Sequence, residues 1–271
     1  MDDVKIAEEC AKRALDELGK TEAVRLTLND EKPDIFSSKF GGTPYLPHDS
    51  MPPLSKYQYN DEAAQLRFLA QIDLSQVKHP DFPDTGLLQF WIAGDDCWGL
   101  PDNFKVLYYE TIDPTVTEDE VRAKLTPFTP MDEEFFPVHG EYGITFEKVM
   151  ETCPTNSRES IQLFLKYYNE ATGEKWEDTW NMPSDIRYDV LEKLNSIYGH
   201  KMGGSADFCQ GDPRYDDGYK RDFQLLQVSK DFGSDGERIM WGDAGVAHFF
   251  IDKDKLRNKD FSDILYYADC C

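Results

Sequence analysis

The sequence lacks the features that mark secreted, membrane-spanning and nucleotide-binding proteins. Its N-terminus has no charged segment followed by an apolar one, as a secretory signal has. No apolar run approaches the ~18 residues that span a bilayer. The phosphate-binding patterns G-x-x-x-x-G-K-[ST] and G-x-G-x-x-G and the nucleophile elbow G-x-S-x-G do not occur. We therefore expect a cytoplasmic protein that has no membrane partner and no bound cofactor.

Closely spaced pairs of metal ligands are missing as well. The six cysteines form no C-x-x-C pair, and the five histidines form no H-x-x-x-H pair. Zinc sites are built from such local pairs, so we expect no metal. The cysteines, including Cys270 and Cys271 at the end of the sequence, are interpreted as free thiols, which are the usual state in the cytoplasm.

Basic residues are scarce. The sequence holds 29 lysines and arginines against 52 aspartates and glutamates, which gives a net charge of −23. Nucleic-acid binding requires a basic face that pairs with phosphates, so we exclude nucleic acid as a partner. Two interpretations of the acidity remain open. It keeps the protein soluble, or it attracts a basic protein partner, because surface charge steers encounters.

The sequence contains a weakened copy of itself. Residues 84–92 (DTGLLQFWI) reappear at 243–251 (DAGVAHFFI), with Asp, Gly, Phe and Ile identical at matching places. Three more pairs of segments follow the same order, at separations between 156 and 162 residues: 40–42 with 202–204, 69–72 with 225–228, and 107–109 with 265–267. The ordered matches predict an internal duplication.

The pattern predicts a single domain of α+β class over 1–271, built from two related antiparallel β-meander halves. The first repeat covers about 38–113 and the second about 201–271, with a helical insert over about 114–200. An N-terminal amphipathic helix is expected over 3–18, since its apolar residues fall on one face and Gly19 follows. Strands are expected at 22–28, 66–74, 87–92, 105–110, 223–228, 246–251 and 264–268.

Several of these segments resemble the YwqG-like family, a bacterial domain family of unknown function. The resemblance is carried by 39–47, 69–74 and 86–91 in the first half, and by 203–204, Gln210, 212–214, 225–228 and 240–245 in the second. It implies a single-domain cytoplasmic protein, and some relatives of this kind lie in toxin–immunity gene neighbourhoods. The resemblance implies no catalytic residues.

Five residues are candidates for a ligand site. Arg214 can hold a carboxylate with two hydrogen bonds, either a ligand's or one of the chain's own, such as that of Asp243. Asp84 and Asp243 each stand two residues before a glycine, where a carboxylate can accept from the N–H groups of the turn. Trp241 is expected in the core or in a cleft wall, and His248 lies on the repeated strand.

The glycine pairs at 41–42 and 203–204 are interpreted first as turns that permit close backbone approach. The alternative is that their N–H groups form an anion-binding nest.

The leading functional interpretation is a non-catalytic cytoplasmic binding or interaction protein, with an immunity-like role as one form of it. Its acidic surface would contact a basic protein. The alternative is a small-molecule binding protein or hydrolase with a cleft between the two halves, in which Arg214 holds an anionic group and Asp243 acts as a base.

Overall fold

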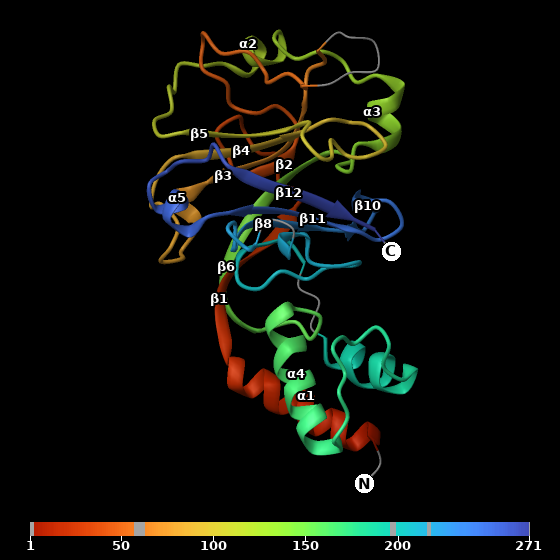
Figure 1. The fold of residues 1–271 in the computed structure, drawn as a ribbon. Coiled ribbons are helices and arrows are strands. Elements are labelled where there is room, and N and C mark those ends of the chain that lie inside the picture. Colours follow the sequence, from red (N-terminus) through yellow and green to blue (C-terminus); the bar gives the residue numbers. More distant parts are fainter. Residues whose placement is uncertain (1–2, 57–62, 196–198, 216–217, 271) are drawn as a thin grey trace.

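The computed structural model describes residues 3–56, 63–195, 199–215 and 218–270. Within them, ten antiparallel strands form one large sheet that makes up the main body of the molecule, and a group of helices forms a smaller lobe at one end (Figure 1). The fold is thus a mixture of helices and strands around one antiparallel sheet. The helix and strand bounds follow.

The strands of the large sheet are β1 (Lys20–Asn29), β2 (Lys39–Gly41), β3 (Arg67–Asp73), β4 (Leu87–Ile92), β5 (Phe104–Tyr109), β6 (Glu141–Thr152), β7 (Lys201–Gly203), β8 (Phe223–Ser229), β11 (Val246–Ile251) and β12 (Ile264–Asp269). A separate hairpin consists of β9 (Asp231–Gly233) and β10 (Gly236–Ile239).

The helices are α1 (Asp3–Leu18), η1 (Leu74–Gln76), α2 (Glu118–Arg122), α3 (Pro130–Phe135), α4 (Arg158–Thr172), η2 (Asp185–Glu192), η3 (Pro213–Tyr215) and α5 (Lys253–Arg257). The bounds of α1 are those expected from its apolar periodicity. Among the described residues, no helix is both long enough and apolar enough to cross a membrane.

Strands β1 and β6 lie at the centre of the sheet, whose order is β12-β11-β8-β7-β1-β6-β2-β3-β4-β5. The sheet curls until strands from its two ends pack against each other. Phe90 of β4 contacts Phe249 of β11, with ring centroids 4.8 Å apart, and Phe104 of β5 contacts Tyr266 of β12 at 5.1 Å. Aromatic side chains therefore fill the space between the two ends of the sheet.

The prediction of a helical insert over 114–200 is wrong in the middle of that range. Residues Glu141–Thr152 form β6, one of the two central strands of the sheet. Residues 143–152 of β6 pair with β1, and residues 141–143 pair with β2. Only three of its residues are buried, so its sequence has no clear apolar alternation. Hydrogen bonding to β1 over most of its length, rather than apolar patterning, makes this segment a strand.

The strand order places the matched segments in corresponding positions. β2 to β5 follow one another outward from β6, and β7, β8, β11 and β12 follow one another outward from β1. β1, which precedes the first half in sequence, therefore pairs with β7, the first strand of the second half. β6, which precedes the second half, pairs with β2, the first strand of the first half. Arg25 pairs with Lys201 as Gly143 pairs with Lys39, so positions on β1 and β6 that differ by the same interval correspond. Thr27 and Thr145 are such a pair, and they lie opposite each other between β1 and β6.

The registers correspond in detail. Each half has a bulge between its second and third strands, at Leu69 in β3 and at Leu225 in β8. One sequence match is shifted, however. Gln89 pairs with Leu107, whereas His248 pairs with Tyr267. By register, Leu107 thus corresponds to Tyr267 and not to Leu265, its expected match. Because the shift is two residues, the matched side chains still lie on the same face of the sheet.

The helical lobe has its own core. α1, α4 and η2 bury Ala7, Ala11 and Ala14 of α1 against Phe164 and Tyr168 of α4 and neighbouring apolar residues. Small residues on α1 let the two helices approach closely. Ser157 caps α4 by accepting a hydrogen bond from the N–H of Ser160 at 3.2 Å, and Gly173 ends the helix in the left-handed conformation.

Candidate functional site

Each half contains a row of three buried polar residues that are direct partners across neighbouring strands. In the first half the row is Lys39, Gln71 and Gln89 on β2, β3 and β4. In the second half it is Lys201, Gln227 and His248 on β7, β8 and β11. All six side chains are at most 1% exposed, so each of these polar groups needs an internal partner.

In the first half the row holds the loop that follows β2. Gln71 Oε1 accepts a hydrogen bond from the backbone N–H of Tyr45 at 2.9 Å, and Gln89 Nε2 donates to the carbonyl of Tyr45 at 2.6 Å. Gln89 Nε2 also donates to Gln71 Oε1 at 2.8 Å, and Trp91 Nε1 donates to Gln89 Oε1 at 3.0 Å. The two glutamines therefore fix the path of this loop over the sheet.

In the second half the row holds the matching loop. Gln227 Oε1 accepts from the backbone N–H of Asp207 at 3.2 Å, as Gln71 does from Tyr45. His248 takes the place of Gln89, is fully buried, and packs against Phe208 at 4.7 Å between ring centroids. Burial holds the pKa of His248 well below its ordinary value of 6.5, and the nearby charges of Lys201 and Arg214 act in the same direction. The imidazole is therefore neutral in the folded protein.

The two double-glycine turns each lie against a glutamate of β6. A Cβ on Gly42 would lie 2.1 Å from Oε1 of Glu141, and one on Gly204 would lie 2.2 Å from Oε1 of Glu151. Both glycines have a φ in the left-handed region. These positions therefore exclude side chains for two independent reasons, close approach and backbone conformation.

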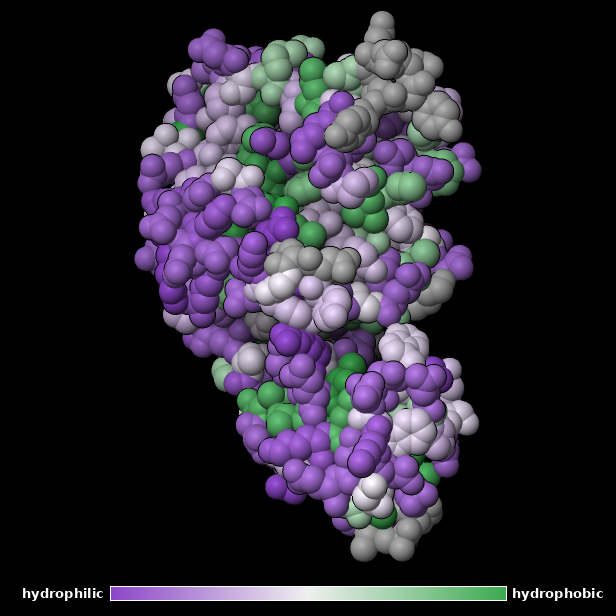
Figure 2. All heavy atoms as spheres, viewed as in Figure 1, coloured by the Kyte–Doolittle hydropathy of each residue, from purple (hydrophilic) through white to green (hydrophobic). Residues whose placement is uncertain are grey.

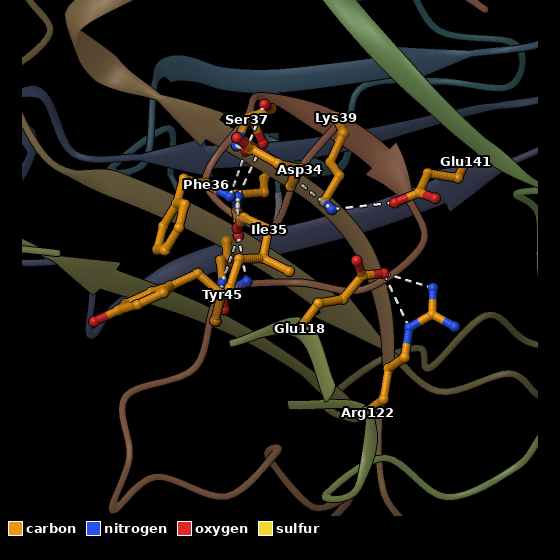
Figure 3. A network of polar contacts seen from close by, with 11 residues as sticks. Asp34, Ile35, Phe36, Ser37, Lys39, Tyr45, Glu118, Arg122 and Glu141 are labelled. Carbon is orange, nitrogen blue, oxygen red and sulfur yellow. Dashed lines mark hydrogen bonds and ion pairs between the residues drawn. The ribbon is translucent and has the colours of Figure 1, made fainter. Parts of the chain in front are cut away.

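The same glutamates pair with the lysines that begin the turns. Lys39 Nζ lies 3.2 Å from Glu141 Oε1 and donates to the carbonyl of Asp34 at 2.9 Å (Figure 3). Lys201 Nζ lies 2.8 Å from Glu151 Oε1, and both of those side chains are 1% exposed. Burial lowers the pKa of the Lys39 ammonium, and Glu141 opposes that effect.

The carboxylate beside each glycine pair thus belongs to the protein itself. Ser205 N–H donates to Glu151 Oε1 at 3.0 Å, so a turn amide does bind an anion here, although an internal one. The expected role of the glycines in close backbone approach accounts for both turns.

Arg214 is engaged within its own loop. Its Nε and Nη2 donate to the two carboxylate oxygens of Asp212 at 2.8 and 2.6 Å, and its Nη1 donates to the carbonyl of Asp222 at 2.9 Å. Its guanidinium carbon lies 4.7 Å from the ring centroid of Phe250. The internal ion pair expected for Arg214 is present, but the partner is Asp212 rather than Asp243.

The other candidates are spread over the fold. Trp241 is fully buried, packs against Trp98 at 5.9 Å between ring centroids, and its Nε1 has no partner among the described residues. Asp84 and Asp243 occupy exposed turns before β4 and β11, and no hydrogen bond or ion pair of either is found in the described ranges. Arg214 and His248 share the neighbours Phe208 and Phe250, but the five candidates do not converge on one place.

A cavity of about 320 Å³ lies in the first half, on the outer side of the sheet. Trp91, Phe68, Phe128 and Phe136 are among its walls, and residues of the Gly41–Gly42 turn and Gly140 also line it. Phe128 is 45% exposed, so the cavity reaches the surface beside this ring. Its size falls at the lower end of the range typical of ligand pockets.

Arg67 is the charged residue in the wall of this cavity. Its Nη2 donates to Asp132 Oδ2 at 2.6 Å and to the carbonyl of Pro127 at 3.0 Å, and its guanidinium carbon lies 4.8 Å from the centroid of Phe128. Asp132 also caps α3 by accepting from the N–H of Thr129 at 2.7 Å. The pair is therefore neutral overall and holds Phe128 in place.

Sequence reasoning did not identify Arg67, Phe128 or this cavity. The walls come from five separate segments, 41–42, 65–68, 91, 125–128 and 136–140, and no local motif connects them. The one available signal was Arg67 itself, a charged residue directly before the apolar run 68–70.

No group of three or more histidine, cysteine, aspartate or glutamate side chains that could hold a metal ion is found in the part of the chain that the structure describes. A comparison with curated proteins finds no match. The sequence does match a family of domains of unknown function, DUF1963, over residues 38–270, a range that includes the six residues of the two polar rows. Since the match covers most of the sequence, the chain belongs to the DUF1963 family.

Proposed function

We propose that this protein is a non-catalytic cytoplasmic binding protein whose acidic surface contacts a basic protein partner. The net charge of −23 is the observation that carries the proposal. The buried cations Lys39, Arg67, Lys201 and Arg214 are each paired with a carboxylate of the chain, so they are not available to bind an acidic partner. Surface acidity of this size favours encounter with a basic surface.

The environment of the candidate catalytic groups supports a non-catalytic role. His248 is buried and neutral, and the Arg214 guanidinium binds Asp212 and Asp222. Asp243 lies on an exposed turn and has no partner among the described residues. A hydrolase with a cleft between the halves has less support, because aromatic rings such as Phe90 and Phe249 fill the space between the sheet ends.

We further propose that the two halves arose by internal duplication, within the YwqG-like branch that the motifs indicate. The paired polar rows, the paired bulges and the opposition of Thr27 and Thr145 support this origin. The duplicated unit would then begin at β1 and at β6 rather than at β2 and β7. An immunity-like role is one form that the proposed binding could take.

The face drawn in Figure 2 is mainly hydrophilic, with apolar residues in smaller groups and a narrowing between the sheet body and the helical lobe. Binding of a basic partner to such a surface has a strong electrostatic part. It should therefore weaken as the salt concentration rises, because salt screens exposed charges.

The experiment is capture of partners from a lysate of cells that carry the gene, with the full-length protein immobilised and both proteins and small molecules identified by mass spectrometry. The matched control is an unrelated protein of similar net charge. We expect enrichment of one or a few basic proteins over the control, lost on washing at high salt. Enrichment of a small molecule without any protein, or of nothing beyond the control, would contradict the proposal.

A further inference from the structure

The outer face of each half has an aromatic residue at the same register position, Trp91 on β4 and Phe250 on β11. In both halves this residue lies two positions after a residue of the polar row, Gln89 or His248. The two rings nevertheless have different surroundings. Trp91 lines the cavity, whereas Phe250 is covered by the guanidinium of Arg214 at 4.7 Å.

A second contact places Arg214 at the counterpart of the cavity. Its Nη1 donates to the carbonyl of Asp222, the residue directly before β8. The residue directly before β3 is Leu66, which lines the cavity together with Trp91. In the second half, the planar side chain of Arg214 therefore fills the place that corresponds to the cavity of the first half.

The walls of the cavity favour a flat apolar group over a second cation. A guanidinium placed there would lie next to Arg67, whose own charge is already matched by Asp132. An aromatic ring can instead pack against Trp91 and Phe128 and against the face of the Arg67 guanidinium. Rings of this kind are the usual anchors of protein interfaces.

The rim of the cavity is acidic and partly apolar. α3, which begins two residues after Phe128, exposes Glu133 and Glu134. Met131 on α3 is 48% exposed. A second copy of this chain is a poor occupant, since each copy carries a charge of −23.

We propose that this cavity receives an aromatic side chain of the basic partner, flanked in the partner by lysine or arginine residues that face Glu133 and Glu134. The proposal rests on the proposed function and assigns it a binding site. Phe128 and Arg67 form the wall that the ring contacts, and the glutamates supply the charge that selects a basic neighbourhood around it.

The test is a titration followed by NMR, in which the full-length protein is mixed with the blocked peptide Lys-Lys-Phe-Lys-Lys at low ionic strength. Two peptides separate the contributions: Lys-Lys-Ser-Lys-Lys keeps only the charge, and Glu-Glu-Phe-Glu-Glu keeps only the ring. We expect the first peptide to bind about 10-fold more tightly than either of the others. The proposal would be overturned if the serine peptide, or free indole, bound as tightly as Lys-Lys-Phe-Lys-Lys does.

Matched variants locate the binding. Phe128→Ala should weaken binding of the phenylalanine peptide about 10-fold and leave the serine peptide unchanged. Trp180→Ala is the control, since Trp180 is also an exposed ring beside an arginine, with Arg187 at 5.6 Å, but lies outside the cavity. Glu133→Lys with Glu134→Lys should weaken both basic peptides, whereas Glu174→Lys with Glu177→Lys, on an exposed part of the helical lobe, should have a smaller effect.

The variants also separate this proposal from the broader one. If the wild-type protein captures a basic partner from the lysate and Phe128→Ala captures it equally well, the cavity is not the binding site and the proposed function stands. If the wild-type protein captures no protein partner, the proposed function fails as well.

Discussion

Phe90 and Phe249 occupy corresponding positions on β4 and β11, and their rings touch, with centroids 4.8 Å apart. Contact between two corresponding residues is expected on a two-fold axis that relates two similar halves. The opposition of Thr27 and Thr145 in the central strands gives a second point of the same kind. The two halves thus meet at equivalent residues both in the centre of the sheet and between its curled ends.

The contact between Phe90 and Phe249 should couple the two halves energetically. We expect Phe90→Leu and Phe249→Leu each to lower the free energy of unfolding, and the double variant to show a coupling energy of about 0.5–1.5 kcal/mol, the value typical of aromatic pairs. Urea unfolding of the four proteins measures it. Strictly additive effects would mean that the rings do not interact.

Gly41 should be intolerant of any side chain. Its φ of 65° lies in the left-handed region, and a Cβ would lie 2.1 Å from the backbone carbonyl oxygen of Gly140. We expect Gly41→Ala to lower the free energy of unfolding by more than about 2 kcal/mol. Gly173→Ala is the control, because Gly173 has a similar φ of 78° but nothing within 4 Å, and it should cost only about 1 kcal/mol. Equal losses in urea unfolding would contradict the close contact.

The buried ion pair of Lys201 and Glu151 should be sensitive to the loss of one partner. Glu151→Gln removes the carboxylate that pairs with the buried Lys201 ammonium, so we expect a loss of about 3–5 kcal/mol in the free energy of unfolding. Glu147→Gln breaks the exposed pair with Arg25, whose atoms lie 3.7 Å apart, and should cost less than about 1 kcal/mol. Similar values for the two variants, measured by urea unfolding, would show that the Lys201–Glu151 pair is not desolvated.

Stability should fall as the pH drops below about 6.5, the ordinary pKa of histidine. The pKa of His248 lies well below that value in the folded protein, so below pH 6.5 the unfolded chain binds a proton that the folded one does not. The stabilisation from His248 is therefore present above the unfolded pKa and is lost as the pH falls toward the folded one. Burial lowers the pKa of His79 as well, which adds to the same slope.

The variant His248→Gln places in the second half the residue that the first half has at Gln89, and it should flatten this slope. His139→Gln, at an exposed histidine, is the matched control. The check is the free energy of urea unfolding between pH 7 and the start of acid unfolding. Burial raises the pKa of Asp207, which opposes the histidines, so the comparison is made between variants and not from the wild-type curve alone. A slope unchanged in His248→Gln would contradict a buried neutral imidazole.

The segments that local pattern could predict are those whose burial follows a simple period. The bounds of α1 match its helical apolar period, and β4 spans Leu87–Ile92, as the repeat suggested. β6 could not be predicted in this way, because it holds charged residues such as Glu147 and Lys148 and is fixed by its neighbours in the sheet.

The candidate site shows the same limit. An internal ion pair of Arg214 was predictable from its type and loop, but the choice of Asp212 over Asp243 depends on how that loop turns. Thr117 and Glu120 show the same effect, since they have the spacing of a capping box. Thr117 does accept from the N–H of Glu120, yet the Glu120 carboxylate pairs with His48, a residue distant in sequence. Long-range partners of this kind decide the role of a polar residue, and a single sequence does not show which residues become partners.

The exchanged positions of β1 and β6 have a consequence for synthesis of the chain on the ribosome. β1 emerges first, but both of its neighbours in the sheet, β6 and β7, are made much later. Strands β2 to β5 likewise lack their inner neighbour until β6 appears. A nascent chain that stalls before residue 141 would expose both edges of β1 and the inner edge of β2. Unpaired strand edges are prone to aggregate, so translation must pass β6 before either half can close.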